Sequence, residues 1–251
     1  MKSRILADDP IYHVPIAHRG FHDQACPENS LAAFARAAEL GYAIELDLHL
    51  LADDTLAVFH DYDLKRMTGQ EGRITNLDKQ DLTSYRLKES DETIPTLEQV
   101  FDLIAGRVPL LLEMKRTEEN AKAALILKEQ IDSYIQKHKG KIWVESFDPH
   151  FLLALKEVAP EILRGQLATQ GLPIDLEESV KLAQCAYNDL TEPDFIAYYI
   201  ADPPLDLFEI WRRQGLPIIG WTVKNESQWQ QAIKNFDNLI FEGFRPEEIS
   251  D

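Results

Sequence analysis

Apolar and charged residues alternate over residues 44–50, where Glu45, Asp47 and His49 lie between four aliphatic residues. Successive side chains of a strand point to opposite faces, so this pattern predicts a strand with one aliphatic face and one polar face. A strand on the protein surface would turn its aliphatic face to the core and its charges to water. A second stretch of the chain argues against that simple arrangement.

Residues 108–115 repeat the alternation, with Glu113 and Lys115 on one face and three apolar residues on the other. The apolar face already supplies a surface that can pack against helices. We therefore expect Glu113 and Lys115 to point to the opposite side of the sheet, together with Glu45 and Asp47. Two such strands predict one shared polar site.

Strands and helices alternate along the remainder of the chain. We expect further strands at 14–17, 55–60, 142–147, 162–168, 195–200, 217–223 and 239–241, and helices at 30–41, 97–104, 118–138, 149–158, 176–185, 205–214 and 227–235. Without residues 55–60, which return as a hairpin, there are eight principal strands in a chain of 251 residues. The pattern predicts an α/β fold, a (β/α)8 TIM barrel with a small insertion after the hairpin of the second strand. An open doubly wound sheet is the alternative, but it would favour a glycine-rich turn after the first strand, where only Gly20 stands.

The small insertion is expected at residues 61–94, where periodicity is weak and polar residues are frequent. We interpret this segment as a lid or cap over the barrel mouth. No other shift in composition divides the chain, so we expect one TIM-barrel domain over residues 1–251.

An excess of acidic residues narrows the possible partners. With 26 Lys plus Arg and 43 Asp plus Glu, the formal net charge is −17. Nucleic-acid binding requires a basic surface, so we expect no nucleic-acid partner, whereas a small anionic substrate can bind beside a local cation. The chain has two cysteines, no signal-peptide pattern and no apolar run of about 20 residues. We expect a cytoplasmic protein without stable membrane insertion, and the oligomeric state is left open.

In a (β/α)8 barrel, active sites lie at the carboxyl ends of the strands. Three buried carboxylates that face one another there would repel unless a cation neutralises them. Oxygen ligands favour a hard ion, so we expect one divalent cation, Mg²⁺ or Ca²⁺. The residues expected at this mouth are His18, Arg19, Glu45, Asp47, His60, Glu113 and Lys115.

The cationic residues and histidines of this group fit the chemistry of a phosphate ester. Arg19 offers a forked donor to phosphate oxygens, and Lys115 offers a second positive charge. Cleavage of a phosphodiester requires a base for the nucleophile and an acid for the leaving alcohol, which the imidazoles of His18 and His60 can provide. We expect a supporting or packing role for His49. Surface or core positions are expected for His13, His22, His138 and His150.

At these residues the sequence resembles the glycerophosphodiester phosphodiesterase family, in particular its compact cytosolic bacterial-type members. The motifs that carry the resemblance follow one another in family order over most of the chain. They are His-Arg-Gly at 18–20, Pro-Glu-Asn-Ser at 27–30, Glu-Leu-Asp at 45–47, Val-Phe-His-Asp at 58–61, Ile-Pro-Thr-Leu at 94–97, Leu-Glu-Met-Lys at 112–115, Ser-Phe-Asp at 146–148 and Gly-Trp-Thr-Val at 220–223.

The resemblance implies a phosphoric diester hydrolase of glycerol and lipid metabolism, which converts glycerophosphodiesters to glycerol 3-phosphate and an alcohol. It implies a single divalent cation on Glu45, Asp47 and Glu113. The glycerol hydroxyl of the substrate would attack phosphorus and form a cyclic phosphate that water opens. By the same resemblance, one histidine of the pair His18 and His60 would be the base and the other the acid, in that order or the reverse. The two cationic residues would hold the phosphate.

Two features leave the preferred substrate open. The last strand of the family commonly ends in Thr-Asp or Thr-Asn before a proline, whereas residues 241–246 read Phe-Glu-Gly-Phe-Arg-Pro. Trp221 and Phe147 are candidates for a substrate pocket that accepts a quaternary ammonium group, with core packing as the alternative. Two other functions stay open: a phospholipase D-like enzyme acting on lysophospholipids, for which exposed apolar loops are expected, and a catalytically silent ligand-binding barrel.

Overall fold

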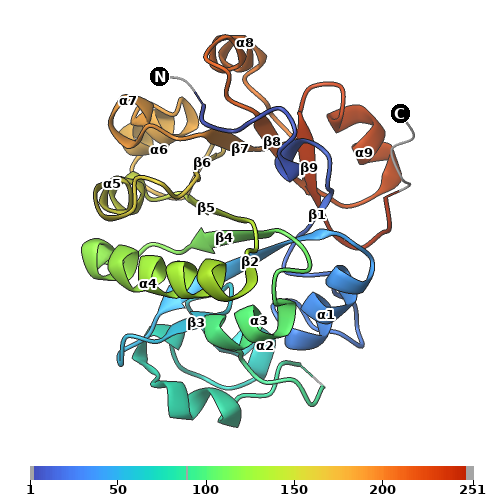
Figure 1. Ribbon diagram of the computed structural model, residues 1–251, viewed down its shortest axis with the longest axis vertical. Coiled ribbons are helices and arrows are strands. Elements are labelled where there is room, and N and C mark those ends of the chain that lie inside the picture. The colour runs from blue at the N-terminus through green and yellow to red at the C-terminus, as the bar shows by residue number, and fades with distance from the viewer. Residues whose placement is uncertain (1–2, 89, 247–251) are drawn as a thin grey trace.

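The alternating stretches of the sequence form the wall of a closed barrel (Figure 1). The structure is a computed structural model that describes residues 3–88 and 90–246. Both ends of the expected domain, 1–2 and 247–251, lie outside the described residues, as does residue 89 of the expected insertion. The first strand pairs in parallel with the second and the last, which closes the barrel and confirms the expected TIM-barrel fold. The eight parallel strands are β1 (Ile16–Ala17), β2 (Ala43–Leu50), β4 (Leu110–Met114), β5 (Ile142–Ser146), β6 (Arg164–Ala168), β7 (Phe195–Tyr199), β8 (Ile218–Val223) and β9 (Asn238–Phe241).

Several helices begin where the sequence supplies a capping side chain. The Ser30 hydroxyl accepts a hydrogen bond from the backbone N–H of Ala33, and Thr96 and Gln99 form a capping box. Among the residues that the structure describes, no helix is both long and apolar enough to cross a membrane. Outside residues 51–96, the helices of the described chain are η1 (Pro10–Tyr12), α1 (Leu31–Glu39), α3 (Leu97–Ile104), α4 (Asn120–His138), α5 (Pro149–Val158), α6 (Leu176–Ala183), α7 (Asn188–Thr191), α8 (Leu205–Arg213) and α9 (Glu226–Ala232).

Most observed elements lie within a few residues of the expected ones. The first strand, expected at residues 14–17, is confined to Ile16–Ala17 because Pro15 has no N–H to donate to a neighbouring strand. The last helix, expected at residues 227–235, begins at Glu226 and ends at Ala232.

Apolar side chains form two layers on opposite sides of the barrel wall. In the outer layer, strand residues such as Leu46 pack with helix residues such as Leu127. The inner layer consists largely of the alternate strand residues, whose side chains point into the barrel. Leu111 and Trp143 are among them. The aliphatic face of β2 therefore lies against the helices as expected, and its acidic face points into the barrel.

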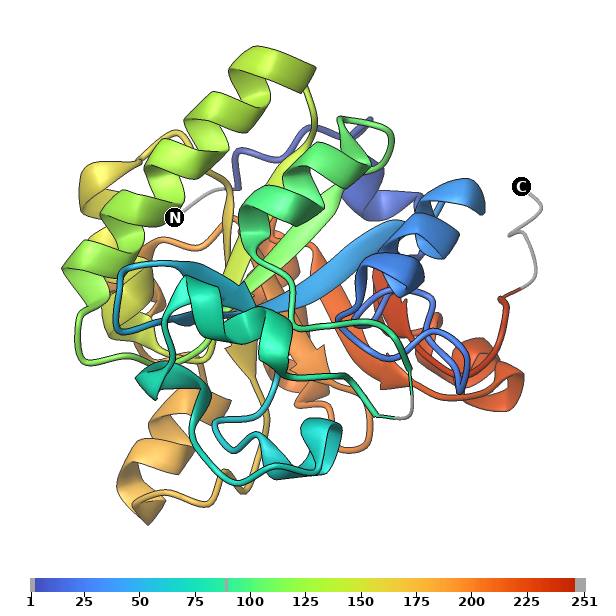
Figure 2. The same ribbon diagram turned by 90° about the horizontal axis from the view of Figure 1, so that it is seen from below.

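The segment between β2 and α3 leaves the barrel and has an apolar cluster of its own. It contains the antiparallel strand β3 (Leu56–Val58), then α2 (Lys65–Thr68), η2 (Ile74–Asn76) and η3 (Lys79–Ser84). Leu64, Met67 and Leu82 pack together in this cluster. Figure 2 shows the segment in blue-green at the near side of the barrel.

β6 and β7 approach each other closely at Gly165, and a substitution there can test the packing of the barrel. Gly165 stands opposite Phe195, and a Cβ at position 165 would come within 2.1 Å of the phenylalanine ring. We predict that Gly165→Ala lowers the free energy of unfolding by about 2 kcal/mol, because overpacking forces the ring or the backbone to move. Urea unfolding followed by circular dichroism measures the loss. Phe195→Leu should then lower the free energy of unfolding less in the Gly165→Ala background than in the wild type. An equal loss in the two backgrounds would contradict this explanation.

Candidate active site

A cavity of about 110 Å³, here called the mouth cavity, opens at the carboxyl ends of the strands. Apart from Asp47, every site residue expected from the sequence lines it. Asp47 is fully buried and contacts the lining residues Arg19 and Lys115. The lining residues are His18, Arg19, Glu45, His60, Glu113, Lys115, Glu145, Phe147, Leu167, Trp221, Thr222 and Ile240.

Carboxylates from neighbouring strands converge on this cavity. Glu45, Asp47 and Glu113 each offer an oxygen within 4.8 Å of the others, because Asp47 of β2 pairs in register with Glu113 of β4. Burial raises the pKa of Glu45 well above its usual range, and the charges of Asp47 and Glu113 raise it further. Burial likewise raises the pKa of Glu113.

Glu145 adds a fourth buried carboxylate that the sequence analysis did not identify. It stands on β5 opposite Glu113, and burial followed by the charge of Glu113 raises its pKa well above the usual range. The alternation of β5 places Trp143 and Glu145 on the same inward face. That alternation is the signal that would have revealed Glu145.

The donor set fits a hard divalent cation. Glu45 Oε1 is buried and has no hydrogen-bond partner, and carboxylate oxygens are the ligands that Mg²⁺ and Ca²⁺ prefer. Lys115 Nζ lies 2.6 Å from Asp47 Oδ1 and 2.6 Å from Glu113 Oε1. Burial would lower the pKa of Lys115, but these two carboxylates outweigh it and raise the pKa. The lysine therefore stays charged beside the acidic cluster.

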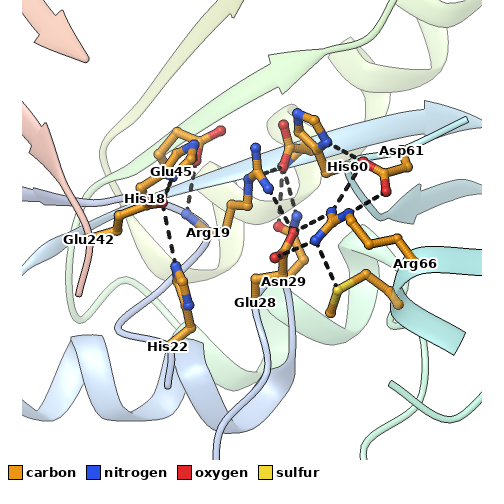
Figure 3. Close-up of polar contacts among 12 residues, drawn as sticks. His18, Arg19, His22, Glu28, Asn29, Glu45, His60, Asp61, Arg66 and Glu242 are labelled. Atoms are coloured by element: carbon orange, nitrogen blue, oxygen red, sulfur yellow. Dashed lines mark hydrogen bonds and ion pairs between the residues drawn. The ribbon is translucent and has the colours of Figure 1, made fainter. Parts of the chain in front are cut away.

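The His18 imidazole is oriented by Glu242, which follows the last strand. Nδ1 lies 2.5 Å from Glu242 Oε2, whereas Nε2 faces Glu45 Oε2 at 3.9 Å (Figure 3). Burial would raise the pKa of Glu242, but the hydrogen bond from His18 and the contacts with His22 and Lys224 hold it far below its usual range. An ionised carboxylate can only accept, so Nδ1 carries a proton. Burial lowers the pKa of His18, which favours the neutral ring, in which Nε2 is an acceptor.

Neither Glu242 nor His22 was expected at the site. His22 Nε2 lies 3.7 Å from Glu242 Oε2, and Lys224 Nζ lies 2.8 Å from Glu242 Oε1. Of the sequence features, only the unusual Phe-Glu-Gly at the end of the last strand indicated a change in this wall of the mouth.

His60 has a carboxylate partner of its own, so the two histidines are held in the same way. Its Nδ1 lies 2.6 Å from Asp61 Oδ1, and Arg66 Nε donates to Asp61 Oδ2 at 2.5 Å. Burial lowers the pKa of His60. His49 Nε2 lies 3.1 Å from the backbone oxygen of His60, and burial lowers the pKa of His49 to about 4. His49 is therefore a neutral residue that packs behind His60, in agreement with the supporting role expected for it.

The Pro-Glu-Asn-Ser turn connects the two sides of the mouth (Figure 3). Glu28 accepts hydrogen bonds from Arg19 Nη1 at 2.7 Å and from Arg66 Nη2 at 2.8 Å. Asn29 Nδ2 donates to Asp47 Oδ2 at 2.7 Å. The turn thus supports both the arginine and the acidic cluster.

Two aromatic side chains form part of the wall of the mouth cavity. The Phe147 and Trp221 rings meet edge to face with their centroids 5.6 Å apart, and both line the cavity. Each ring therefore packs against the other while keeping one side toward the cavity.

Comparisons with known proteins agree with this arrangement. The sequence model of the Glycerophosphoryl diester phosphodiesterase family matches residues 18–241. A glycerophosphodiester phosphodiesterase of Caldanaerobacter subterraneus subsp. tengcongensis is 28% identical over 90% of this chain and 92% of its own length. A human lysophospholipase D is 32% identical over 87% of this chain and 79% of its own length. A solved phosphodiesterase of Oleispira antarctica, in complex with the product sn-glycerol-3-phosphate, has a TM-score of 0.76 at 24% identity, over 91% of this chain and 92% of its own, and supports the fold.

The barrel and its acidic mouth therefore define a hydrolase of phosphoric diesters. The chain belongs to the glycerophosphoryl diester phosphodiesterase family.

The Glu28 contacts give a prediction about stability and pH. Burial would raise the pKa of Glu28, but Arg66 and Arg19 outweigh it and bring the pKa from 4.5 to about 2. We predict that Glu28→Gln lowers the free energy of unfolding by about 3 kcal/mol at neutral pH. A carboxyl group whose pKa is lower in the folded state stabilises the fold at pH values above its unfolded-state pKa. The stability difference between the wild type and Glu28→Gln is therefore complete above pH 4.5 and shrinks as the pH falls toward 2.

Urea unfolding of both proteins at a series of pH values from 7 downward measures this difference. The matched control is Glu39→Gln at an exposed position of α1, which should leave stability nearly unchanged. A loss at position 28 that is the same at every pH would show that charge is not its cause.

Proposed function

We propose that this enzyme hydrolyses glycerophosphodiesters to glycerol 3-phosphate and an alcohol, with a divalent cation and two histidines as acid and base. The observation that carries the proposal is the matched pairing of His18 with Glu242 and of His60 with Asp61 at one cavity. Each pairing occupies Nδ1 and leaves Nε2 of the ring available for proton transfer.

Glu45, Asp47 and Glu113 would hold the cation, either Mg²⁺ or Ca²⁺. Their oxygens within 4.8 Å of one another and the unpartnered Glu45 Oε1 support this assignment. When bound, a divalent cation supplies positive charge that stabilises negative charge on the phosphate oxygens.

In the proposed reaction, His18 Nε2 accepts the proton of the glycerol hydroxyl that attacks phosphorus. His60 donates a proton to the oxygen of the departing alcohol as its bond to phosphorus breaks. Water then opens the cyclic phosphate, and the two histidines exchange roles so that both recover their starting protonation. The carboxylate partner of each ring leaves both histidines able to transfer protons through Nε2, and this supports a pair of acid and base groups.

Arg19 and Lys115 would hold the phosphate. Both line the mouth cavity, and Arg19 is fixed by Glu28 at 2.7 Å and by Asp47 at 3.3 Å. A guanidinium that is held on both sides loses little conformational entropy when it binds a phosphate oxygen. This supports the phosphate-binding role proposed for Arg19.

A direct assay tests the reaction. The purified protein with Mg²⁺ or Ca²⁺ should release glycerol 3-phosphate from glycerophosphocholine or glycerophosphoethanolamine, EDTA should stop the release, and added cation should restore it. His18→Gln and His60→Gln should each lower kcat by about 10²- to 10⁴-fold, whereas His13→Gln at an exposed position should not. No release from any glycerophosphodiester would reject the proposal, and tight binding without turnover would favour a silent ligand-binding barrel.

The role proposed for Glu242 is to position His18. Glu242→Gln keeps the shape of the side chain but removes the charge, so kcat should fall about 10- to 100-fold while KM changes little. Steady-state kinetics with glycerophosphoethanolamine, together with thermal melting, measures both effects. Glu209→Gln on the exposed side of α8 is the control. A loss of activity that is matched by a loss of folded protein would argue for a merely structural role.

A further inference from the structure

A second group of side chains that can bind a metal lies beside the mouth cavity, apart from the acidic cluster. His18, His22 and Glu242 each offer one ligand atom, and these three atoms lie within 4.8 Å of one another. Of the three residues, only His18 lines the mouth cavity. This group, here called the His–Glu cluster, therefore stands at the Nδ1 side of His18, whereas Nε2 of the same ring faces Glu45.

A tight turn after β1 brings the two histidines together. Gly20 has a φ of +80°, and a Cβ at this position would come within 2.9 Å of the Ala33 backbone. The turn is therefore packed against α1, and the His22 N–H donates to the Gly20 carbonyl at 3.0 Å. Because β1 pairs with β9, the turn places both imidazoles beside Glu242 at the end of β9. Closure of the barrel thus assembles the three ligands.

The distances within the His–Glu cluster are close to those of a zinc site. Glu242 Oε2 lies 2.5 Å from His18 Nδ1 and 3.7 Å from His22 Nε2. With bonds of about 2.0–2.1 Å, neighbouring ligand atoms of a tetrahedral Zn²⁺ ion lie about 3.3 Å apart. The two observed distances bracket this value, so shifts of about 1 Å or less would admit the ion.

His22 carries a ring nitrogen that has no other role in the structure. Its Nε2 is buried and has no hydrogen-bond partner among the described residues, because 3.7 Å to Glu242 Oε2 is too long for one. Figure 3 shows the His22 ring pointing toward His18 and Glu242. Burying a polar atom without a partner is unfavourable, and a metal ion bound at this nitrogen would satisfy it.

The ligand set fits Zn²⁺ better than Mg²⁺ or Ca²⁺. Imidazole nitrogens together with a carboxylate oxygen are typical ligands of Zn²⁺, whereas the hard ions prefer oxygen alone. A metal also requires an ionised carboxylate, which the lowered pKa of Glu242 provides. Lys224 Nζ lies 2.8 Å from Glu242 Oε1, so Oε2 is left to the histidines. The Lys224 side chain is 64% exposed, and water and salt therefore screen its charge.

We propose that His18, His22 and Glu242 bind Zn²⁺ and that this ion inhibits the enzyme. The inhibition rests on the role of base proposed for His18. Zn²⁺ binds the lone pair of Nδ1, and the proton that Nδ1 carried passes by way of solvent to Nε2. A neutral imidazole has a single N–H, so Nε2 then no longer accepts the proton of the glycerol hydroxyl. The ring stays neutral, and the acidic cluster keeps its own cation.

A titration with Co²⁺, used as a coloured substitute for Zn²⁺, tests the metal site. Saturating Mg²⁺ is present to occupy the acidic cluster. One equivalent of Co²⁺ should give the strong visible absorption of a four-coordinate ion, and Zn²⁺ should abolish it by displacement. His22→Gln should weaken Co²⁺ binding by at least about 10- to 100-fold, whereas His13→Gln at an exposed position should leave it unchanged. The absence of a band that depends on His22 would overturn the proposed site.

Thermal melting gives a second measurement that needs no substituted protein. An ion that binds the folded state alone raises the melting temperature. Zn²⁺ should therefore raise the melting temperature of the wild type in the presence of saturating Mg²⁺. No rise at Zn²⁺ concentrations that saturate the Co²⁺ competition would contradict binding to the folded protein.

Hydrolysis of glycerophosphoethanolamine tests the inhibition. With saturating Mg²⁺, Zn²⁺ should lower kcat of the wild type and of His13→Gln at the same concentration. His22→Gln should need at least about 10- to 100-fold more Zn²⁺ for the same fractional loss. Each rate is divided by the rate of that variant without Zn²⁺, so a partial loss of folded protein does not affect the comparison. Inhibition that additional Mg²⁺ relieves, or that is equal in the wild type and His22→Gln, would assign the effect to the acidic cluster and overturn the inhibitory role.

The outcomes separate this proposal from the proposed function. If no glycerophosphodiester is hydrolysed, the proposed function and the inhibition both fail, whereas the Co²⁺ spectrum still decides whether the His–Glu cluster binds a metal. If glycerophosphoethanolamine is hydrolysed and no band depends on His22, only the metal site is wrong.

Discussion

The burial of several carboxylates inside one barrel is the constraint on which the site depends. Glu45, Asp47, Glu113 and Glu145 project inward from three neighbouring strands. Two unit charges about 5 Å apart repel by roughly 3 kcal/mol at an effective dielectric constant of 20. Protonation or nearby positive charge must reduce this repulsion in the folded protein. Lys115, the residue after β4, supplies positive charge. A bound divalent cation would complete the compensation.

Residues outside the mouth cavity also take part in this charge compensation. Glu28 holds Arg19 and Arg66, and Arg66 in turn contacts Asp61, which orients His60. One chain of ion pairs therefore runs from the end of the first strand to the segment after β3. The positions of the cationic side chains and of one histidine are coupled through a single glutamate.

Much of the barrel could be predicted from the sequence because period-two alternation is a local signal. In β2 the pattern separates Leu46, which faces the helices, from Glu45, which faces the interior. Glu145 obeys the same alternation, but a single acid in an otherwise apolar strand gives little indication of a site. Glu242 could not be predicted from spacing, since it acts on a histidine 224 positions away.

The contact between the first and last strands has a consequence for how the enzyme is made. His18 follows β1, Glu242 follows β9, and the hydrogen bond between them exists only when these two strands lie side by side. A growing chain that ends before residue 238 already contains both histidines and the four inward carboxylates, yet nothing orients His18. The orientation of His18 by Glu242 is thus completed only when the last strand has joined the barrel.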